Sequence, residues 1–173
     1  MRRIPAARLT LEPQVEAHAE EMFALLQDPA IYEHENEPPA SVERLRDRFR
    51  RLESRTSADG SEAWLNWVVR LHTAELAGFV QATVRGDGSA AIAYVLASRF
   101  WGKGLASEAV RAMVRELTEN YRVTELSAVL KRGNVRSVRL LERLGLEPAP
   151  AAAHARFELE PGEVLMQGGI PPP

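Results

Sequence analysis

The stretch Arg99-Phe100-Trp101-Gly102-Lys103-Gly104-Leu105-Ala106 decides the fold. It separates an apolar strand predicted at 90–97 from an amphipathic helix predicted from Leu105 to about Asn120. The first backbone N–H groups of a helix have no partners within it, and the helix dipole favours negative charge there. Glycine lets the backbone approach a ligand closely, and Lys103 adds positive charge. The stretch therefore predicts an anion site, with a tight strand-to-helix connection that merely uses glycine as the alternative.

Composition narrows the class of protein. The 173 residues suit one domain, and 45% hydrophobic with 27% charged residues is ordinary for a globular protein. A net charge of −2 gives no general attraction to nucleic acid or anionic membranes. The absence of cysteine excludes disulfides, thiolate metal sites and a cysteine nucleophile. The N-terminus lacks a signal-peptide core, and the longest apolar run is far shorter than a membrane span. We therefore expect a cytoplasmic protein without nucleic-acid or membrane partners.

Hydrophobic periodicity predicts a single α/β domain. Strands are predicted at 8–11, 64–71, 76–84, 90–97, 124–130, 154–159 and 164–167. Helices are predicted from Glu12-Pro13, with the proline in the first turn, after Ser41, from Leu105 and after Asn134. Three strands form an antiparallel meander before the glycine turn, and a crossover long enough for parallel pairing follows it. The domain is expected to span 1–167, with 168–173 as a frayed, disordered tail.

Two better-known phosphate loops do not fit the glycine turn. A P-loop needs G-x-x-x-x-G-K-[ST], which the chain lacks. A dinucleotide fingerprint needs G-x-G-x-x-G, but Ser107 stands at the third glycine position. Leu130 and Lys131 also occupy the end of the next strand, where an acidic residue is expected. The sequence therefore disfavours both nucleotide-binding folds.

Two motifs carry a resemblance to a known family. Arg99-x-x-Gly102-x-Gly104 resembles the Q/R-x-x-G-x-G/A signature of the GNAT superfamily of N-acetyltransferases, and the run 101–109 is similar to the branch that contains the ribosomal-protein N-terminal acetyltransferases. Asn134-x-x-Ser137, followed by 140–146, resembles that branch's Asn-x-x-Ser helix and its closing Gly-Phe, here Gly-Leu. The resemblance covers most of the chain. It implies a mixed, mostly antiparallel, twisted sheet of about seven strands with helices on both faces and splayed central parallel strands.

The resemblance also implies acetyl-CoA as co-substrate and no metal. In this family the glycine turn holds the pyrophosphate through backbone N–H groups, and the pantetheine arm lies between the splayed strands, here 90–97 and 124–130. A backbone N–H near Val95 or Leu96 is then expected to bond the acetyl carbonyl, which needs no particular side chain. The expected cofactor-binding residues are Val95, Leu96, Ala97, Arg99, Trp101, Gly102, Lys103, Gly104, Leu105, Ala106, Asn134 and Ser137.

The implied reaction is direct attack of a neutral amine on the thioester in a ternary complex, so it needs a proton acceptor and a proton donor. Many family members donate from a tyrosine on the last helix, where this chain has Leu141. Ser137 resembles the serine assigned to this role in the ribosomal branch, and the alternative is that it only bonds its own helix backbone. Asn134 is an N-cap that either acts alone or also bonds the cofactor.

The proton acceptor is expected between the first two helices, where the family builds its acceptor site. The titratable residues of this acidic stretch are Glu33, His34, Glu35 and Glu37. We select Glu35 as the catalytic base, although a solvated loop is the plainer interpretation of any one of them. The other histidines have no neighbours in sequence that suggest a metal site.

We therefore expect an N-acetyltransferase that transfers acetyl from acetyl-CoA to a primary amine, with a protein N-terminal α-amino group as the preferred acceptor. A small amine, such as an amino acid, polyamine or aminoglycoside, is the alternative within the same chemistry. A non-catalytic acyl-CoA-binding module is the alternative from a different class. Similar proteins commonly form a homodimer, and the closing strands offer an interface, but nothing in the sequence requires one.

Overall fold

The computed structural model describes residues 1–34, 37–157 and 159–170, which build one eight-stranded sheet in the order β1-β2-β3-β4-β5-β6-β8-β7. The strands are β1 (Ile4–Pro5), β2 (Leu9–Pro13), β3 (Glu62–Leu71), β4 (Leu76–Arg85), β5 (Ser89–Leu96), β6 (Glu125–Lys131), β7 (Glu147–Pro148) and β8 (Glu163–Gly169). The α-helices are α1 (Ala19–Leu25), α2 (Val42–Leu52), α3 (Leu105–Tyr121) and α4 (Val135–Glu142). The 3₁₀ helices are η1 (Glu16–His18), η2 (Pro29–Glu33), η3 (Ser98–Phe100) and η4 (Ala151–Arg156).

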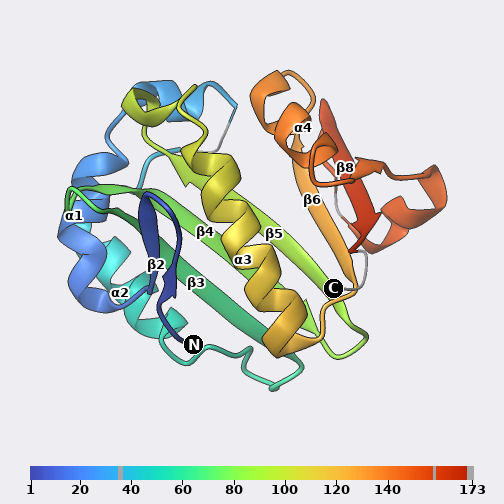
Figure 1. Ribbon diagram of the computed structural model, residues 1–173, viewed down its shortest axis with the longest axis horizontal. Helices are drawn as coiled ribbons and strands as arrows, with labels where there is room; N and C mark the ends of the chain where they lie inside the picture. Colours follow the sequence, from blue (N-terminus) through green and yellow to red (C-terminus); the bar gives the residue numbers. More distant parts are fainter. Residues whose placement is uncertain (35–36, 158, 171–173) are drawn as a thin grey trace.

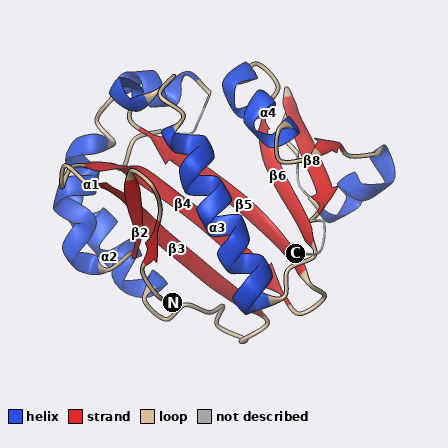
Figure 2. Cartoon of the chain, in the orientation of Figure 1, coloured by secondary structure: helices blue, strands red, loops and turns tan. Residues whose placement is uncertain are grey.

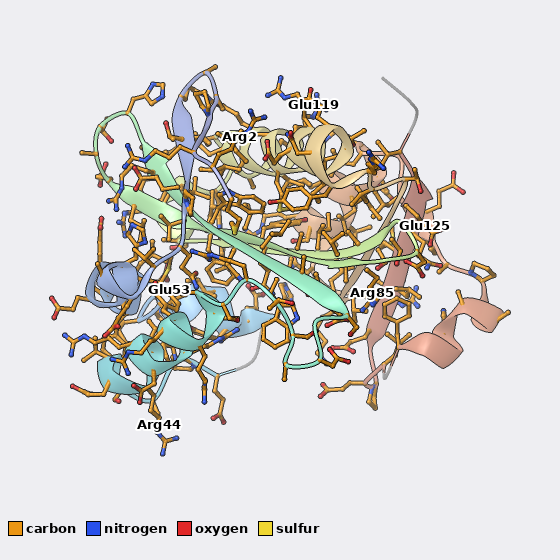
Figure 3. All side chains as sticks on the ribbon, turned by 90° about the horizontal axis from the view of Figure 1, so that it is seen from below. Arg2, Arg44, Glu53, Arg85, Glu119 and Glu125 are labelled. Atoms are coloured by element: carbon orange, nitrogen blue, oxygen red, sulfur yellow. The ribbon has the colours of Figure 1, made fainter. Side chains whose placement is uncertain are left out.

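Helices cover both faces of this sheet, as expected. Helix α3 crosses one face, and α1 and α2 lie against the other (Figures 1 and 3). Each helix buries one apolar stripe, which for α3 includes Ala109, Met113 and Leu117 and for α2 includes Leu45 and Phe49. Within the described ranges, no helix is both long enough and apolar enough to cross a membrane.

Strands β5 and β6 diverge, which confirms the expected splay. They are the parallel pair, and their register contains only Ser89↔Glu125, Ala90↔Leu126 and Ala91↔Ser127. Beyond these pairs β5 stays bonded to β4 and β6 stays bonded to β8, so the two strands separate towards their carboxyl ends (Figure 2). The glycine turn follows β5 and α4 follows β6, so both motifs begin at the open end of the splay.

The C-terminal part differs from the sequence-based prediction. The strand predicted at 154–159 is wrong, because 151–156 form η4, with Phe157 N donating to His154 O at 2.9 Å. A run of three alanines favours a tight helical turn over an extended strand. The chain instead forms the short strand β7 immediately after Leu146, and this strand pairs with β8.

The tail predicted at 168–173 is also wrong in its first part. Strand β8 continues through Gly169, and Ile170 N donates to Thr124 O at 2.8 Å. A Cβ at Gly168 would lie 2.5 Å from Gly145 O, so glycine is needed here for close backbone contact rather than for flexibility. Residues 171–173 lie outside the described part of the chain.

Gly78 in β4 lies against β5 where β5 approaches the glycine turn. A Cβ at this position would lie 2.0 Å from Val95 O and 2.8 Å from Leu96 Cα. Its φ of +155° is also one that residues with a side chain rarely adopt. Gly78 therefore fixes the position of the β5 backbone at the edge of the splay.

Gly78→Ala should lower the free energy of unfolding by about 3 kcal/mol, because the added methyl overlaps backbone that cannot move independently. Urea unfolding followed by circular dichroism measures the change. Gly86→Ala is the matched control, since no atom lies within 4 Å of its Cβ position. The control should lie within about 1 kcal/mol of the wild type. Equal stability of the two variants would contradict the packing argument.

Candidate active site

The glycine turn presents unpaired backbone donors. Gly102 and Gly104 have φ of +72° and +75°, the left-handed region in which glycine is favoured. Gly104 is the N-cap of α3 and has no side chain with which to cap it. The first helical bond of this turn runs from Glu108 N to Gly104 O at 3.1 Å. The N–H groups of residues 105–107 therefore have no acceptor within the helix, and they are available to an anion.

A cavity of about 420 Å³, here called the turn-side cavity, opens between this turn, β5, η2 and α4. Its volume lies within the range of small-molecule sites. The expected cofactor residues that line it are Val95, Leu96, Trp101, Gly102, Gly104, Leu105, Ala106, Asn134 and Ser137. Ala97, Arg99 and Lys103 do not line it. The Arg99 guanidinium and the Lys103 ammonium instead lie over the Phe100 ring, at 4.6 and 5.8 Å from its centroid.

The positive charge of the turn-side cavity comes from α4, which the sequence analysis missed. Arg136, Arg139 and Arg143 line the cavity from one face of the helix, because residues three and four apart lie on the same side. The Arg136 guanidinium also lies 4.0 Å from the centroid of Trp101 and so bridges α4 and the glycine turn. The spacing of these arginines after the Asn134 N-cap was a sequence signal that could have identified them.

The hydrogen bonds of β5 show which backbone N–H group, that of Val95 or that of Leu96, points into the gap between β5 and β6. Ala97 N donates to Ala77 O at 3.0 Å, so this N–H faces β4. Because N–H groups alternate in direction along a strand, Val95 N–H also faces β4 and Leu96 N–H faces the side of β6. The Leu96 carbonyl accepts a hydrogen bond from Trp101 Nε1 at 2.7 Å. Leu96 therefore supplies the N–H that points into the splay.

A second cavity of about 310 Å³, here called the α2-side cavity, lies between α2, η2 and the separated parts of β5 and β6. Most of its lining residues are apolar, and Glu37 and Arg48 are the charged ones. The two cavities share Ile31, Tyr94, Val95 and Ser137, which we call the junction. Tyr94, which the sequence analysis also missed, donates its hydroxyl to Ser137 O at 3.3 Å across the splay.

The helix-cap role of Asn134 is confirmed, since its Oδ1 accepts from Ser137 N at 3.2 Å. Ser137 is half-buried at the junction, and within the described part of the chain its Oγ has no hydrogen-bond partner. Leu141, the expected counterpart of the family's tyrosine, is a buried apolar side chain that lines the α2-side cavity. Ser137 thus presents a free hydroxyl where the two cavities meet.

The expected base region is only partly described. Glu35 lies outside the described residues. Glu33 lines neither cavity, and its Oε1 lies 3.9 Å from His34 Nε2. His34 lines the turn-side cavity and Glu37 lines the α2-side cavity. The residues that the structure describes contain no group of three or more acidic or histidine side chains suited to a metal ion.

Asp28 connects the two segments that border the turn-side cavity on the N-terminal side. Its carboxylate accepts from Ala30 N at 3.1 Å in η2 and from Ser98 N at 2.7 Å in η3. The Ser98 bond stabilises the charged form most and lowers the pKa of Asp28. This carboxylate therefore fixes η2 relative to the start of the glycine turn.

The family model of the acetyltransferase (GNAT) domain matches residues 8–147. This match covers the meander, the glycine turn, β6 and α4. The chain belongs to the GNAT acetyltransferase family. It is an acetyl-CoA-dependent acyltransferase by family, which confirms the resemblance seen in the two sequence motifs. A search of curated protein sequences finds no match.

Solved GNAT structures share the whole fold of this chain. RimL, the ribosomal L7/L12 α-N-protein acetyltransferase in complex with coenzyme A, is 17% identical with a TM-score of 0.80, over 97% of this chain and 98% of that one. The ribosomal-protein-S5-alanine acetyltransferase from Vibrio fischeri is 14% identical with a TM-score of 0.78, over 98% and 97%. A GNAT acetyltransferase from Bacillus anthracis is 19% identical with a TM-score of 0.75, over 96% and 98%. At these identities the likeness establishes the fold.

Arg8, which precedes β2, forms hydrogen bonds to the glycine turn and to the first turn of α3. Arg8 Nη1 donates to Lys103 O at 2.8 Å, while its Nε and backbone N bond the two Glu108 carboxylate oxygens, each at 2.7 Å. Glu108 lies in the first turn of α3, where its negative charge would otherwise oppose binding of an anion. Arg8 therefore both orders the turn and neutralises the carboxylate beside it.

Arg8→Ala should weaken coenzyme A binding roughly three- to tenfold, about 1 kcal/mol, because the turn loses a bond and Glu108 loses its counter-charge. The double variant Arg8→Ala/Glu108→Ala should bind more tightly than Arg8→Ala alone, since no uncompensated carboxylate remains. Titration calorimetry measures both affinities. The control is Arg111→Ala, an exposed arginine on the same helix. Wild-type affinity in Arg8→Ala would contradict the bracing role.

Proposed function

We propose that this GNAT enzyme transfers acetyl from acetyl-CoA to the α-amino group of a protein N-terminus. The observation that carries the proposal is the junction between the two cavities. The turn-side cavity is suited to the acetyl donor, and the α2-side cavity, which meets it at the junction, is suited to the acceptor amine. An acceptor that enters beside α2 meets the donor between β5 and α4. The fold shared with two ribosomal-protein acetyltransferases supports a polypeptide N-terminus as the acceptor.

The turn-side cavity fits coenzyme A chemically. The N–H groups of residues 105–107, which have no acceptor within α3, and the arginines of α4 and its C-cap complement the negative charge of a pyrophosphate. The position where a Cβ of Gly102 would lie has no atom within 4 Å, so the turn leaves open space beside these donors. Val95, Leu96 and Ala106 supply further lining for the cofactor arm.

Acetyl-CoA, when bound, supplies an activated thioester, and the chain supplies polarisation and proton transfer. The Leu96 N–H points into the splay, where it is suited to donate to the thioester carbonyl oxygen. The Ser137 hydroxyl has no hydrogen-bond partner among the residues that the structure describes, and it is suited to give its proton to the departing sulfur. A carboxylate of the 33–37 segment takes the proton from the acceptor's ammonium group, so that the amine attacks in its neutral form. Glu35 keeps this role as a prediction, and Glu37 is the described carboxylate that lines the acceptor side.

Gly102→Asp should weaken coenzyme A binding at least tenfold, because it places a carboxylate beside the pyrophosphate donors. Gly102→Asn is the matched control, since asparagine has nearly the same shape, tolerates positive φ and carries no charge. Titration calorimetry should find that the asparagine variant binds clearly more tightly than the aspartate variant. Undiminished affinity in Gly102→Asp would remove the turn from the cofactor site.

Ser137→Ala should lower kcat for peptide acetylation about 10- to 100-fold while leaving the coenzyme A affinity nearly unchanged. The helix cap survives this change, because it uses Asn134 Oδ1 and the Ser137 backbone N–H. A thiol-release assay with peptide acceptors measures kcat. Tyr94→Phe is the companion variant, since it removes the other hydroxyl at the junction.

Loss of turnover in Tyr94→Phe but not in Ser137→Ala would overturn the role given to Ser137. Release of thiol with small amines but with no peptide would overturn the polypeptide acceptor. Tight coenzyme A binding without turnover of any acceptor would support a non-catalytic acyl-CoA-binding module.

A further inference from the structure

Helix α2 carries arginines on two flanks that differ in their partners. On one flank Arg46 bonds Glu20, and Arg50 bonds Glu16 and Asp47 with N···O distances of 2.6 and 2.9 Å. Carboxylates of η1, α1 and α2 itself therefore neutralise this flank. These pairs connect α2 to the preceding helical segments and serve the fold.

The other flank carries only positive charge. Arg44, Arg48 and Arg51 are spaced four and three residues apart, so they share one face of α2, and all three are exposed. Among the described residues, no carboxylate forms an ion pair with any of them. Arg48 lines the α2-side cavity together with Leu45, and Arg44 projects from α2 away from the sheet (Figure 3). We call these three residues the arginine strip.

The α2-side cavity determines where a long acceptor must go. Its volume of about 310 Å³ is at the lower end for small-molecule sites, so a long peptide cannot lie wholly inside it. Its other charged lining residue, Glu37, has the sign that suits an incoming ammonium group. Residues that follow the amine lie outside the cavity, where they meet Arg48 at its rim, with Arg44 one turn before it and Arg51 one turn after it on α2.

We propose that the acceptor is an acidic peptide, whose terminal amine enters the α2-side cavity while carboxylates at the following positions bind Arg44, Arg48 and Arg51. The inference rests on the proposed N-terminal acetyltransferase function and names the class of polypeptide that it acts on. Exposed charge pairs mainly raise the rate of encounter and weaken with added salt. The strip therefore selects acceptors through KM more than through kcat.

Three peptides that share the first residue and carry acidic, neutral or basic residues at the next positions test the charge preference. At low ionic strength, thiol release should show kcat/KM for the acidic peptide at least tenfold above that for the basic peptide, mostly through KM. The ratio should shrink at an ionic strength of about 0.5 M. Acetylation of all three peptides with equal kcat/KM would overturn the acidic acceptor and leave the proposed function intact. Acetylation of none would overturn the proposed function itself.

The triple variant Arg44→Glu/Arg48→Glu/Arg51→Glu should invert the order, so that the basic peptide becomes the better acceptor. Its coenzyme A affinity should stay within twofold of the wild type, which shows that the fold and the turn-side cavity are intact. Arg115→Glu is the matched control, because this exposed arginine lies on α3, across the sheet from α2. An unchanged preference in the triple variant, or an inverted one in Arg115→Glu, would overturn the strip as the selecting element.

Discussion

The separation of β5 from β6 is the constraint on which the site depends. Strand β5 stays paired with β4, and β6 stays paired with β8, so each half of the sheet is continuous. Strands β5 and β6 pair with each other through only three residue pairs and then separate. Backbone groups on the freed edges need other hydrogen-bond partners, which water or a bound molecule supplies. The same separation lets one cavity form on the turn side and another beside α2, with a shared junction between them.

Specific contacts keep the splay at a fixed geometry. Gly78 allows β4 to lie against the β5 backbone at Val95, and Asp28 ties η2 to η3 through two backbone N–H groups. Across the gap, the Tyr94 hydroxyl bonds the carbonyl of Ser137. Arg8 holds the glycine turn from the opposite side. Preorganised donors of this kind need little rearrangement when charge develops in a reaction, which is how a backbone N–H contributes to acyl transfer.

The sequence predicted the features that local rules control. The glycine turn, the helix after Ser41, the Asn134 cap and the β3–β4 pair of the meander follow from motif and periodicity, and the structure contains each of them. Hydrophobic periodicity predicted the order of most elements, and the family resemblance predicted the splay. The prediction of a strand at 154–159 was wrong because hydrophobic alternation alone does not distinguish an extended segment from an alanine-rich helical turn.

Tertiary placement, which sequence spacing does not report, explains what was missed at the site. Arg99 and Lys103 stand beside the glycines in sequence, yet they lie over Phe100, and the cavity takes its positive charge from Arg136, Arg139 and Arg143. Tyr94 reaches the junction from β5, and Arg8 reaches the turn from the other end of the chain.

A conjugate in which coenzyme A is joined through an acetyl bridge to the terminal amine of an acidic peptide tests the central claim most directly. If the two cavities meet at the junction, titration calorimetry should show it binding roughly 100-fold more tightly than coenzyme A alone; affinity no higher than that of coenzyme A would contradict the account.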